Sequence, residues 1–405
     1  MVQTGEGNMG LNEFQHDILA LLRSAFDGTP VTLSAAFDWQ EALAFGRRQS
    51  LLPLLYAGAQ NADRPLPTAL AATVEQKLLQ NLVADSRQQA ALTALYAAFE
   101  QNGIDYMPLK GAGLKALYPA SELRPMGDAD ILIRCTQYEK ISPVMQALGY
   151  TAGTESDHEL VWISDAVKIE LHKKLLPRYN RDYYAYYGDG WRLAVPMQPG
   201  GFRYAMRPED ELVYLITHLA KHYRNGGIGL RHLLDIHVFC AANKALQFGY
   251  VGEQLSRLEL MPFGQHVIRT ANTVFTGGTP DAAGERLLAF MFSGGAFGTY
   301  ERRAVFEAVR KSNTVGGIKK SRRHIFLFHA FPPMDVMEKM YPCLAGKGFL
   351  LPAFWVVRAF DLLLRRRDRI YRQKEEMRLI TDERVAAYHR EMSAVGLGFN
   401  FKETK

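Results

Sequence analysis

The stretch that decides the fold is residues 124–133, which read Arg-Pro-Met-Gly-Asp-Ala-Asp-Ile-Leu-Ile. A Pro- and Gly-containing turn leads into an alternating apolar run, and the side chains of a β-strand alternate between its two faces. Asp128 and Asp130 are therefore predicted to project from the same face of one strand. Two carboxylates this close repel one another, and a bridging divalent cation is the usual way to keep both ionised.

Two flanking segments extend this pattern. Lys110 and Gly111 follow a short apolar segment and open a predicted helix, where Gly111 would let the backbone N–H groups of the helix start approach a phosphate. Residues 168–172 read Lys-Ile-Glu-Leu-His and place Glu170 between two apolar residues of another strand. Three acids around Mg²⁺ would provide a two-metal site, in which one ion activates an attacking oxygen and the other steadies a leaving pyrophosphate. An isolated Asp-x-Asp sequence usually lies in a turn or on a solvated strand. The prediction of a metal site therefore rests on the order of the segments, which is a strand, Lys-Gly, a helix, the turn with Arg124, the Asp-x-Asp strand and a further strand with an acid.

The rest of the chain is mostly helical in pattern. Residues 12–100 show helical periodicity, including a long Ala- and Leu-rich helix at 66–99, and helical periodicity returns at residue 209. Short apolar segments predict strands, at 104–109, 129–133 and 167–171, with 161–164 as a further one. Helices are predicted between them, at 113–118 and 137–148.

The predicted fold class is therefore α+β. We expect a small mixed β-sheet core at residues 101–200, an N-terminal helical region at 1–100 and a larger helical C-terminal domain with a basic tail at 201–405.

Composition excludes several classes of protein. The chain has 405 residues, of which 48% are hydrophobic and 22% charged, so collagen-like, mucin-like and wholly disordered proteins are excluded. Its three cysteines cannot form a disulfide framework, which favours a reducing, cytoplasmic location. No signal sequence is expected, and no apolar run approaches the ~20 residues that a membrane-spanning helix needs. The net charge of +6 is compatible with anionic partners such as nucleotides or nucleic acid.

Several of these segments together resemble a known family. Lys110-Gly111, the turn at 124–127 and Asp128-Ala129-Asp130 look like the bacterial "uncharacterised nucleotidyltransferase" family of the polymerase-β-like nucleotidyltransferase superfamily. Glu170-Leu171-His172 is similar to the acid-apolar-His strand of that family. Further similar segments extend the resemblance over roughly 40–365, at 215–222, 230–236, 293–298, 341–342 and 350–358. Two features depart from the superfamily: Ala112 follows Gly111 where Gly or Ser is usual, and sixteen residues separate Gly111 from Asp128.

The resemblance implies a nucleotidyltransferase that moves an NMP group from an NTP to an acceptor and releases pyrophosphate. Asp128 and Asp130 would hold two Mg²⁺ ions, and Glu170 would complete the acceptor-side ion and help to deprotonate the acceptor. The residues expected to contact the nucleotide are Lys110, Gly111, Arg124, His218, Arg231 and Asp235. A sugar or antibiotic hydroxyl, a protein side chain and an RNA end are all compatible acceptors.

Several of these residues also have simpler interpretations. Lys110 either neutralises a triphosphate or extends from a strand end into solvent. His218 and His222 lie four residues apart on a predicted helix, as a structural pair or as part of the nucleotide cleft, and they lack the Glu of the zinc-protease motif. Arg231 and Asp235 form either a helix-face ion pair or an arginine that reaches a phosphate and is oriented by the aspartate.

Three alternatives concern larger units. Residues 111–116 match the dinucleotide-binding pattern Gly-x-Gly-x-x-Ala, but the acids stand at the start of their strand, where a Rossmann unit has its acid at the end. The run Arg365-Arg366-Arg367 is either a solvated helix face or a weak contact with an acidic membrane surface or RNA. The second functional hypothesis is a non-catalytic nucleotide- or polyanion-binding protein on the same scaffold, which the intact acids make less favoured.

Overall fold

The computed structural model describes residues 10–178, 180–294, 330–344, 346–365 and 381–398, together with single positions at 305, 306, 309, 327 and 378. The chain divides into two compact units. The first holds the described residues of 10–222, 228–294 and 394–398, and the second holds 223–227 and the described residues of 305–393. The predicted α+β fold is confirmed, because the first unit combines helices with a five-stranded mixed sheet.

The sheet has the strand order β1-β2-β5-β4-β3. Its strands are β1 (Tyr106–Pro108), β2 (Asp128–Ile133), β3 (Thr151–Glu155), β4 (Glu159–Ile163) and β5 (Lys168–His172). Only β2 and β5 pair in parallel, and all other neighbours pair antiparallel. The parallel pair lies at the centre of the sheet, so its residues are held in a fixed register on both sides.

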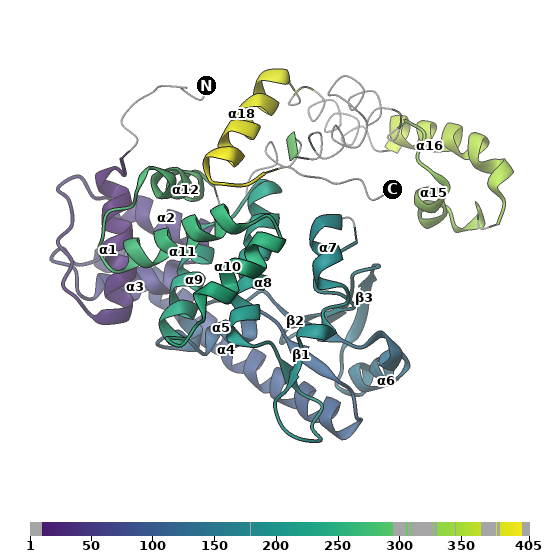
Figure 1. Ribbon diagram of the computed structural model, residues 1–405, viewed down its shortest axis with the longest axis horizontal. Helices are drawn as coiled ribbons and strands as arrows, with labels where there is room; N and C mark the ends of the chain where they lie inside the picture. The colour runs from purple at the N-terminus through teal and green to yellow at the C-terminus, as the bar shows by residue number, and fades with distance from the viewer. Residues whose placement is uncertain are drawn as a thin grey trace. The chain divides into compact units, whose positions relative to one another are not determined.

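The two faces of the sheet differ in chemistry. Ile131 and Leu171 are fully buried and belong to an apolar cluster that includes Leu95 of α4 (Thr68–Gln101) and Met145 of α6 (Tyr138–Ala147). Figure 1 shows α4 and α6 below the sheet, with α7 (Arg181–Tyr187) and α8 (Pro208–Arg224) above it. Because side chains alternate, the residues between the apolar ones face α7 and α8.

The remaining helices of the first unit surround this core. They are α1 (Glu13–Asp27), α2 (Trp39–Gln49), α3 (Leu52–Ala59), α5 (Gly111–Lys115), α9 (Leu230–Ala242), α10 (Phe248–Arg257), α11 (Met261–Phe275) and α12 (Ala282–Ser293). The first helix begins at a capping box, in which the Asn12 side chain accepts from the Gln15 backbone N–H at 2.9 Å and Gln15 reciprocates. A small two-stranded sheet, β6 (Val195–Pro196) and β7 (Tyr204–Ala205), follows α7.

The strands predicted from the sequence are confirmed, whereas β3 was not predicted. All five residues of β3 are exposed, and the segment has no alternation of apolar and polar residues. The sequence therefore does not indicate a strand there, and β3 is defined by its pairing with β4. The antiparallel pairing of β1 with β2 excludes the Rossmann alternative, whose first strands are parallel.

The described residues of the second unit include the helices α15 (Met334–Met340) and α16 (Leu351–Arg365) and all but the last residue of α18 (Asp382–Ala394). The indole N–H of Trp355 on α16 donates to the carbonyl of Pro332 at 2.9 Å. Of the predicted basic run, Arg365 ends α16, and Arg366 and Arg367 lie outside the described residues, as do 295–298 of the segment 293–298. Within the described part of the chain, no helix is long and apolar enough to cross a lipid bilayer.

Gly190 lets the turn after α7 pack closely against β2. Its φ is +95°, and a Cβ atom there would lie 2.5 Å from Cγ of Leu175 and 3.2 Å from a methyl carbon of Leu132. Gly190→Ala should therefore lower the free energy of unfolding by about 2–4 kcal/mol, from overpacking and backbone strain together. Urea denaturation measures the change.

Gly149 provides the matched control, since its φ is +81° but nothing lies within 4 Å of an added Cβ. Gly149→Ala should lower stability by only about 1 kcal/mol. Equal effects of the two substitutions would show that close packing at residue 190 contributes nothing.

Candidate functional site

A cavity of about 260 Å³ opens between the sheet and the helices α8 and α9. Its walls come from β2, β5, the turn after β1 and the two helices. Every residue expected from the sequence to hold the metal or contact the nucleotide lines this one cavity, namely Lys110, Gly111, Arg124, Asp128, Asp130, Glu170, His218, Arg231 and Asp235. Segments more than a hundred residues apart in the chain therefore meet around one space.

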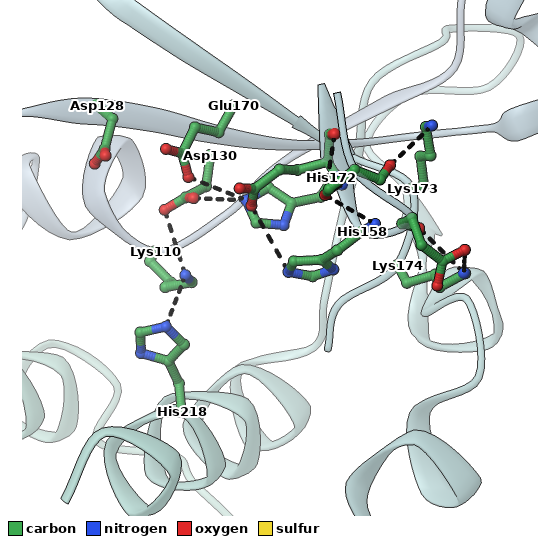
Figure 2. A network of polar contacts seen from close by, with 12 residues as sticks. Lys110, Asp128, Asp130, His158, Glu170, His172, Lys173, Lys174 and His218 are labelled. Atoms are coloured by element: carbon green, nitrogen blue, oxygen red, sulfur yellow. Dashed lines mark hydrogen bonds and ion pairs between the residues drawn. The ribbon is translucent and has the colours of Figure 1, made fainter. Parts of the chain in front are cut away.

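Asp130 and Glu170 come together because β2 and β5 pair in parallel, and Asp128 lies two residues earlier on β2. Asp130 lies opposite Glu170 in the register, and Asp128 lies opposite Lys168. The side chain of Asp128 is 43% exposed, whereas those of Asp130 and Glu170 are 14% and 17% exposed. Figure 2 shows the three carboxylates along one edge of the network.

Two lysines balance these negative charges, and a histidine contacts one of the acids. Lys168 Nζ lies 3.2 Å from Oδ2 of Asp128 and 2.6 Å from Oε1 of Glu170. Lys110 Nζ lies 3.4 Å from one oxygen of Asp130, and Nε2 of His172 lies 2.7 Å from the other. The acids are thus paired with ammonium and imidazole groups rather than with arginine.

These contacts shift the two buried acids in opposite directions. Burial alone would raise the pKa of Asp130, but the charge of Lys110 and the contact with His172 outweigh it, so the pKa lies well below its usual value. Burial raises the pKa of Glu170, and the negative charge of Asp128 adds to this despite the hydrogen bond from Lys168. Asp130 is therefore fully ionised at neutral pH, and Glu170 binds a proton more readily than an ordinary glutamate.

The carboxylates suit a hard divalent cation. Oxygen ligands are those that Mg²⁺ prefers in proteins. One ligand atom each from Asp130, Glu170 and His172 lie within 4.8 Å of one another. Asp128 falls outside that compact group and contacts Lys168 instead. An incoming cation would take over the charge balance that Lys168 and Lys110 now provide.

The opposite wall contains a buried ion pair. Arg124 donates from Nε to Oδ1 of Asp235 at 2.7 Å and from Nη2 to Oδ2 at 2.9 Å, and the Tyr118 hydroxyl donates to the same Oδ1 at 2.7 Å. Burial would raise the pKa of Asp235, but the charge of Arg124 holds it below its usual value. This pair ties the turn before β2 to α9.

Arg231 is placed differently from the helix-face pair with Asp235. Its Nη1 donates to the carbonyl of Pro125 at 3.1 Å, and its Nε is buried without a hydrogen-bond partner among the described residues. Because Arg124 already occupies both oxygens of Asp235, Arg231 is the arginine of this wall without a carboxylate contact in the described part of the chain.

The turn after β1 is strained at Lys110 rather than at Gly111. Lys110 has φ +41° and ψ −102°, in the region that favours glycine. Such a conformation costs about 1–3 kcal/mol and is found preferentially at functional sites. Gly111 begins the short helix α5, and its carbonyl accepts from Nη1 of Arg124 at 3.3 Å.

A histidine pair on α8 holds the Lys110 side chain from the far side. Nε2 of His218 lies 3.0 Å from Nζ of Lys110 and 3.0 Å from Nε2 of His222. An ammonium group can only donate, so His218 accepts from it. Burial, together with the charge of nearby lysines, lowers the pKa of both histidines well below the usual value, so both are neutral.

Sequence reasoning gave no role to Lys168, His172 or His232, although His172 and Lys168 contact the acids and His232 lines the cavity. The sequence could have indicated two of them, because Lys168 and His172 lie two residues before and after Glu170 and therefore share its face of the strand. The position of His232 in the cavity could not be predicted in this way, because it depends on how α9 packs against the rest of the unit.

Comparison of the sequence with known protein families agrees with this architecture. Residues 35–276 match the family described as uncharacterised nucleotidyltransferase, and the chain belongs to that family. The match covers the sheet and every wall of the cavity, while the similar segments at 293–298, 341–342 and 350–358 lie outside it. Searches of curated proteins and of solved structures find no match. Family membership supports a general role in nucleotidyl transfer, and the acidic and histidine groups of the site could hold a metal ion.

Removing the partner of Arg124 should be strongly destabilising. Asp235→Ala leaves a buried guanidinium unpaired, so the free energy of unfolding should fall by about 3–5 kcal/mol. The exposed pair of Glu253 with Arg257, at 2.6 Å, offers the matched control, and Glu253→Ala should change stability by at most about 0.5 kcal/mol. Chemical denaturation at pH 7 measures both.

The stability difference between wild type and Asp235→Ala should depend on pH in a defined way. The folded-state pKa of Asp235 is lowered, so its contribution is complete above the unfolded value of about 3.9 and is lost as the pH falls through the folded pKa. The difference between wild type and Asp235→Ala should therefore be constant from about pH 5 to 7 and shrink below about pH 4. A difference that grows with acid would contradict the ion pair.

Strain at Lys110 can be separated from its charge with two substitutions. Lys110→Ala and Lys110→Gly both remove the ammonium beside Asp130, but only glycine adopts φ +41° without strain. The glycine variant should be more stable than the alanine variant by about 1 kcal/mol in thermal or urea unfolding. An alanine variant as stable as the glycine variant would show that residue 110 is unstrained.

Proposed function

We propose that the cavity binds an NTP with Mg²⁺ and transfers its nucleotidyl group to an acceptor, releasing pyrophosphate. The observation that carries this proposal is that Asp128, Asp130 and Glu170 share a cavity with Lys110 and Arg231. Carboxylates on one wall suit the cation, and cationic side chains nearby suit the phosphates that accompany it.

The metal ligands in this proposal are Asp128, Asp130 and Glu170, holding two Mg²⁺ ions. Bound Mg²⁺ would neutralise the triphosphate and steady the departing pyrophosphate. Oxygen ligands on neighbouring strands fit that role, and Asp130 is ionised without needing the metal, since Lys110 and His172 already lower its pKa.

The chain's own residues then have distinct tasks. The acceptor oxygen attacks the α-phosphorus, the bond from that phosphorus to the pyrophosphate oxygen breaks, and Glu170 takes the acceptor proton, consistent with its raised pKa. Lys110, oriented by neutral His218, and Arg231 contact the phosphates. Arg124 and Asp235 hold the turn that leads into Asp128, with Gly111 beside it.

The compartment proposed for this reaction is the cytoplasm. Cys135, Cys240 and Cys343 are all free thiols, which suits a reducing environment.

Calorimetry tests the metal role directly. Wild-type protein is titrated with an NTP in the presence of Mg²⁺ and again with EDTA, beside the double variant Asp128→Ala/Asp130→Ala. Wild type should bind at least about tenfold more tightly with Mg²⁺ than without it, a difference of about 1.4 kcal/mol, and the double variant should lose this gain. Glu253→Ala, which removes an exposed acid that does not line the cavity, should behave as wild type.

Transfer itself requires a product assay. The protein is incubated with NTPs labelled at the α-phosphate and with cell extract, and label is sought in small molecules, proteins and RNA. Label in any product that depends on Asp128 and Asp130 supports transfer. Tight NTP binding with no labelled product would contradict catalysis and identify a nucleotide-binding protein on the same scaffold.

A further inference from the structure

A second group of metal-binding side chains lies next to the carboxylates. His158, Glu159 and His172 each offer one ligand atom, and these atoms lie within 4.8 Å of one another. The grouping follows from strand pairing, because Glu159 on β4 lies opposite His172 on β5, and His158 directly precedes β4. None of the proposed steps of nucleotidyl transfer uses His158 or Glu159.

The two imidazoles are packed edge to face. Their ring centroids lie 4.7 Å apart with an interplanar angle of 79°, and Nε2 of His158 lies 3.9 Å from a carboxylate oxygen of Glu159. Figure 2 shows His158 beside His172, on the side away from Asp128. Two imidazoles and one carboxylate, which are ligand types that Zn²⁺ takes, therefore lie side by side.

Both imidazoles carry an unsatisfied nitrogen. Nδ1 of His158 and Nδ1 of His172 are buried and have no hydrogen-bond partner among the described residues. The His172 side chain is only 5% exposed, so water does not readily satisfy it. Buried polar atoms without partners are uncommon, and a bound ion is one of the usual reasons for them.

The ligand types select the metal. Two histidines and a glutamate form a set typical of Zn²⁺, whereas Mg²⁺ prefers oxygen ligands alone. A histidine binds a metal ion through an unprotonated ring nitrogen, and each of these two rings has one nitrogen without a hydrogen-bond partner among the described residues. Glu159 is 30% exposed, so this member of the group reaches solvent.

We propose that His158, Glu159 and His172 form a binding site for a transition metal ion, Zn²⁺, separate from the carboxylate site for Mg²⁺. Three protein ligands leave a fourth position for water or another ligand. Since His172 also contacts Asp130 at 2.7 Å, the zinc site adjoins the carboxylates through a shared side chain. The proposal does not depend on nucleotidyl transfer, because it requires only metal binding.

Metal titration of the full chain tests this site without any nucleotide. Protein freed of metal by a chelator is titrated with Zn²⁺ by calorimetry, and with Co²⁺ while its visible absorption is recorded. One ion should bind per chain, with intense tetrahedral Co²⁺ bands, and millimolar Mg²⁺ should not displace it. His158→Ala should weaken Zn²⁺ binding at least tenfold, and Glu159→Gln, at a partly exposed position that tolerates substitution, should weaken it as well.

Two further variants show where an ion binds. Asp128→Ala should leave the Zn²⁺ affinity unchanged, because Asp128 is not among the three ligands. His218→Ala alters the other histidine pair of the site, whose Nε2 atoms lie 3.0 Å apart, and should also leave it unchanged. Absence of stoichiometric Zn²⁺ binding, or an affinity that follows His218 and not His158 and Glu159, would overturn the proposal.

Discussion

The site depends on one electrostatic constraint, which is that like charges are held in register on neighbouring strands. Asp130 and Glu170 face each other across the parallel pair β2–β5. Two unit charges about 4–5 Å apart repel by roughly 3–4 kcal/mol at an effective dielectric constant near 20. This repulsion is offset because the ammonium groups of Lys110 and Lys168 lie against the carboxylates. That balance is what makes the position suitable for a divalent cation, since the negative charge is already assembled and fixed.

The rest of the cavity follows from how the helices attach to this sheet. The apolar face packs on α4 and α6, which leaves the charged face toward α8 and α9. The buried pair of Arg124 with Asp235 fixes the turn that precedes Asp128, and His218 on α8 fixes the ammonium of Lys110. The sheet and these helices belong to the same compact unit, so the walls of the cavity are held together as one structure.

Local sequence patterns predicted the elements but not their partners. Alternation placed Asp128 and Asp130 on one face, and the same rule applied to Glu170. Nothing in the sequence states that β5 pairs in parallel with β2, although this pairing brings Glu170 to Asp130. Similarly, the four-residue spacing of Arg231 and Asp235 suggested a helix-face pair, whereas Asp235 binds an arginine over a hundred residues earlier. Contacts of this kind depend on tertiary packing, which a helical period cannot encode.

The most direct test of the account is whether these carboxylates bind a divalent cation. Mn²⁺ can replace Mg²⁺ at oxygen sites, and its electron paramagnetic resonance signal distinguishes bound from free ion. Titration of the full chain with Mn²⁺ in the presence of a non-hydrolysable NTP should show bound ion in wild type. In Asp130→Asn and Glu170→Gln, which keep the side-chain shapes but remove one negative charge each, binding should weaken at least tenfold. Unchanged Mn²⁺ binding in both variants would contradict the central claim, because the ion would then be held elsewhere.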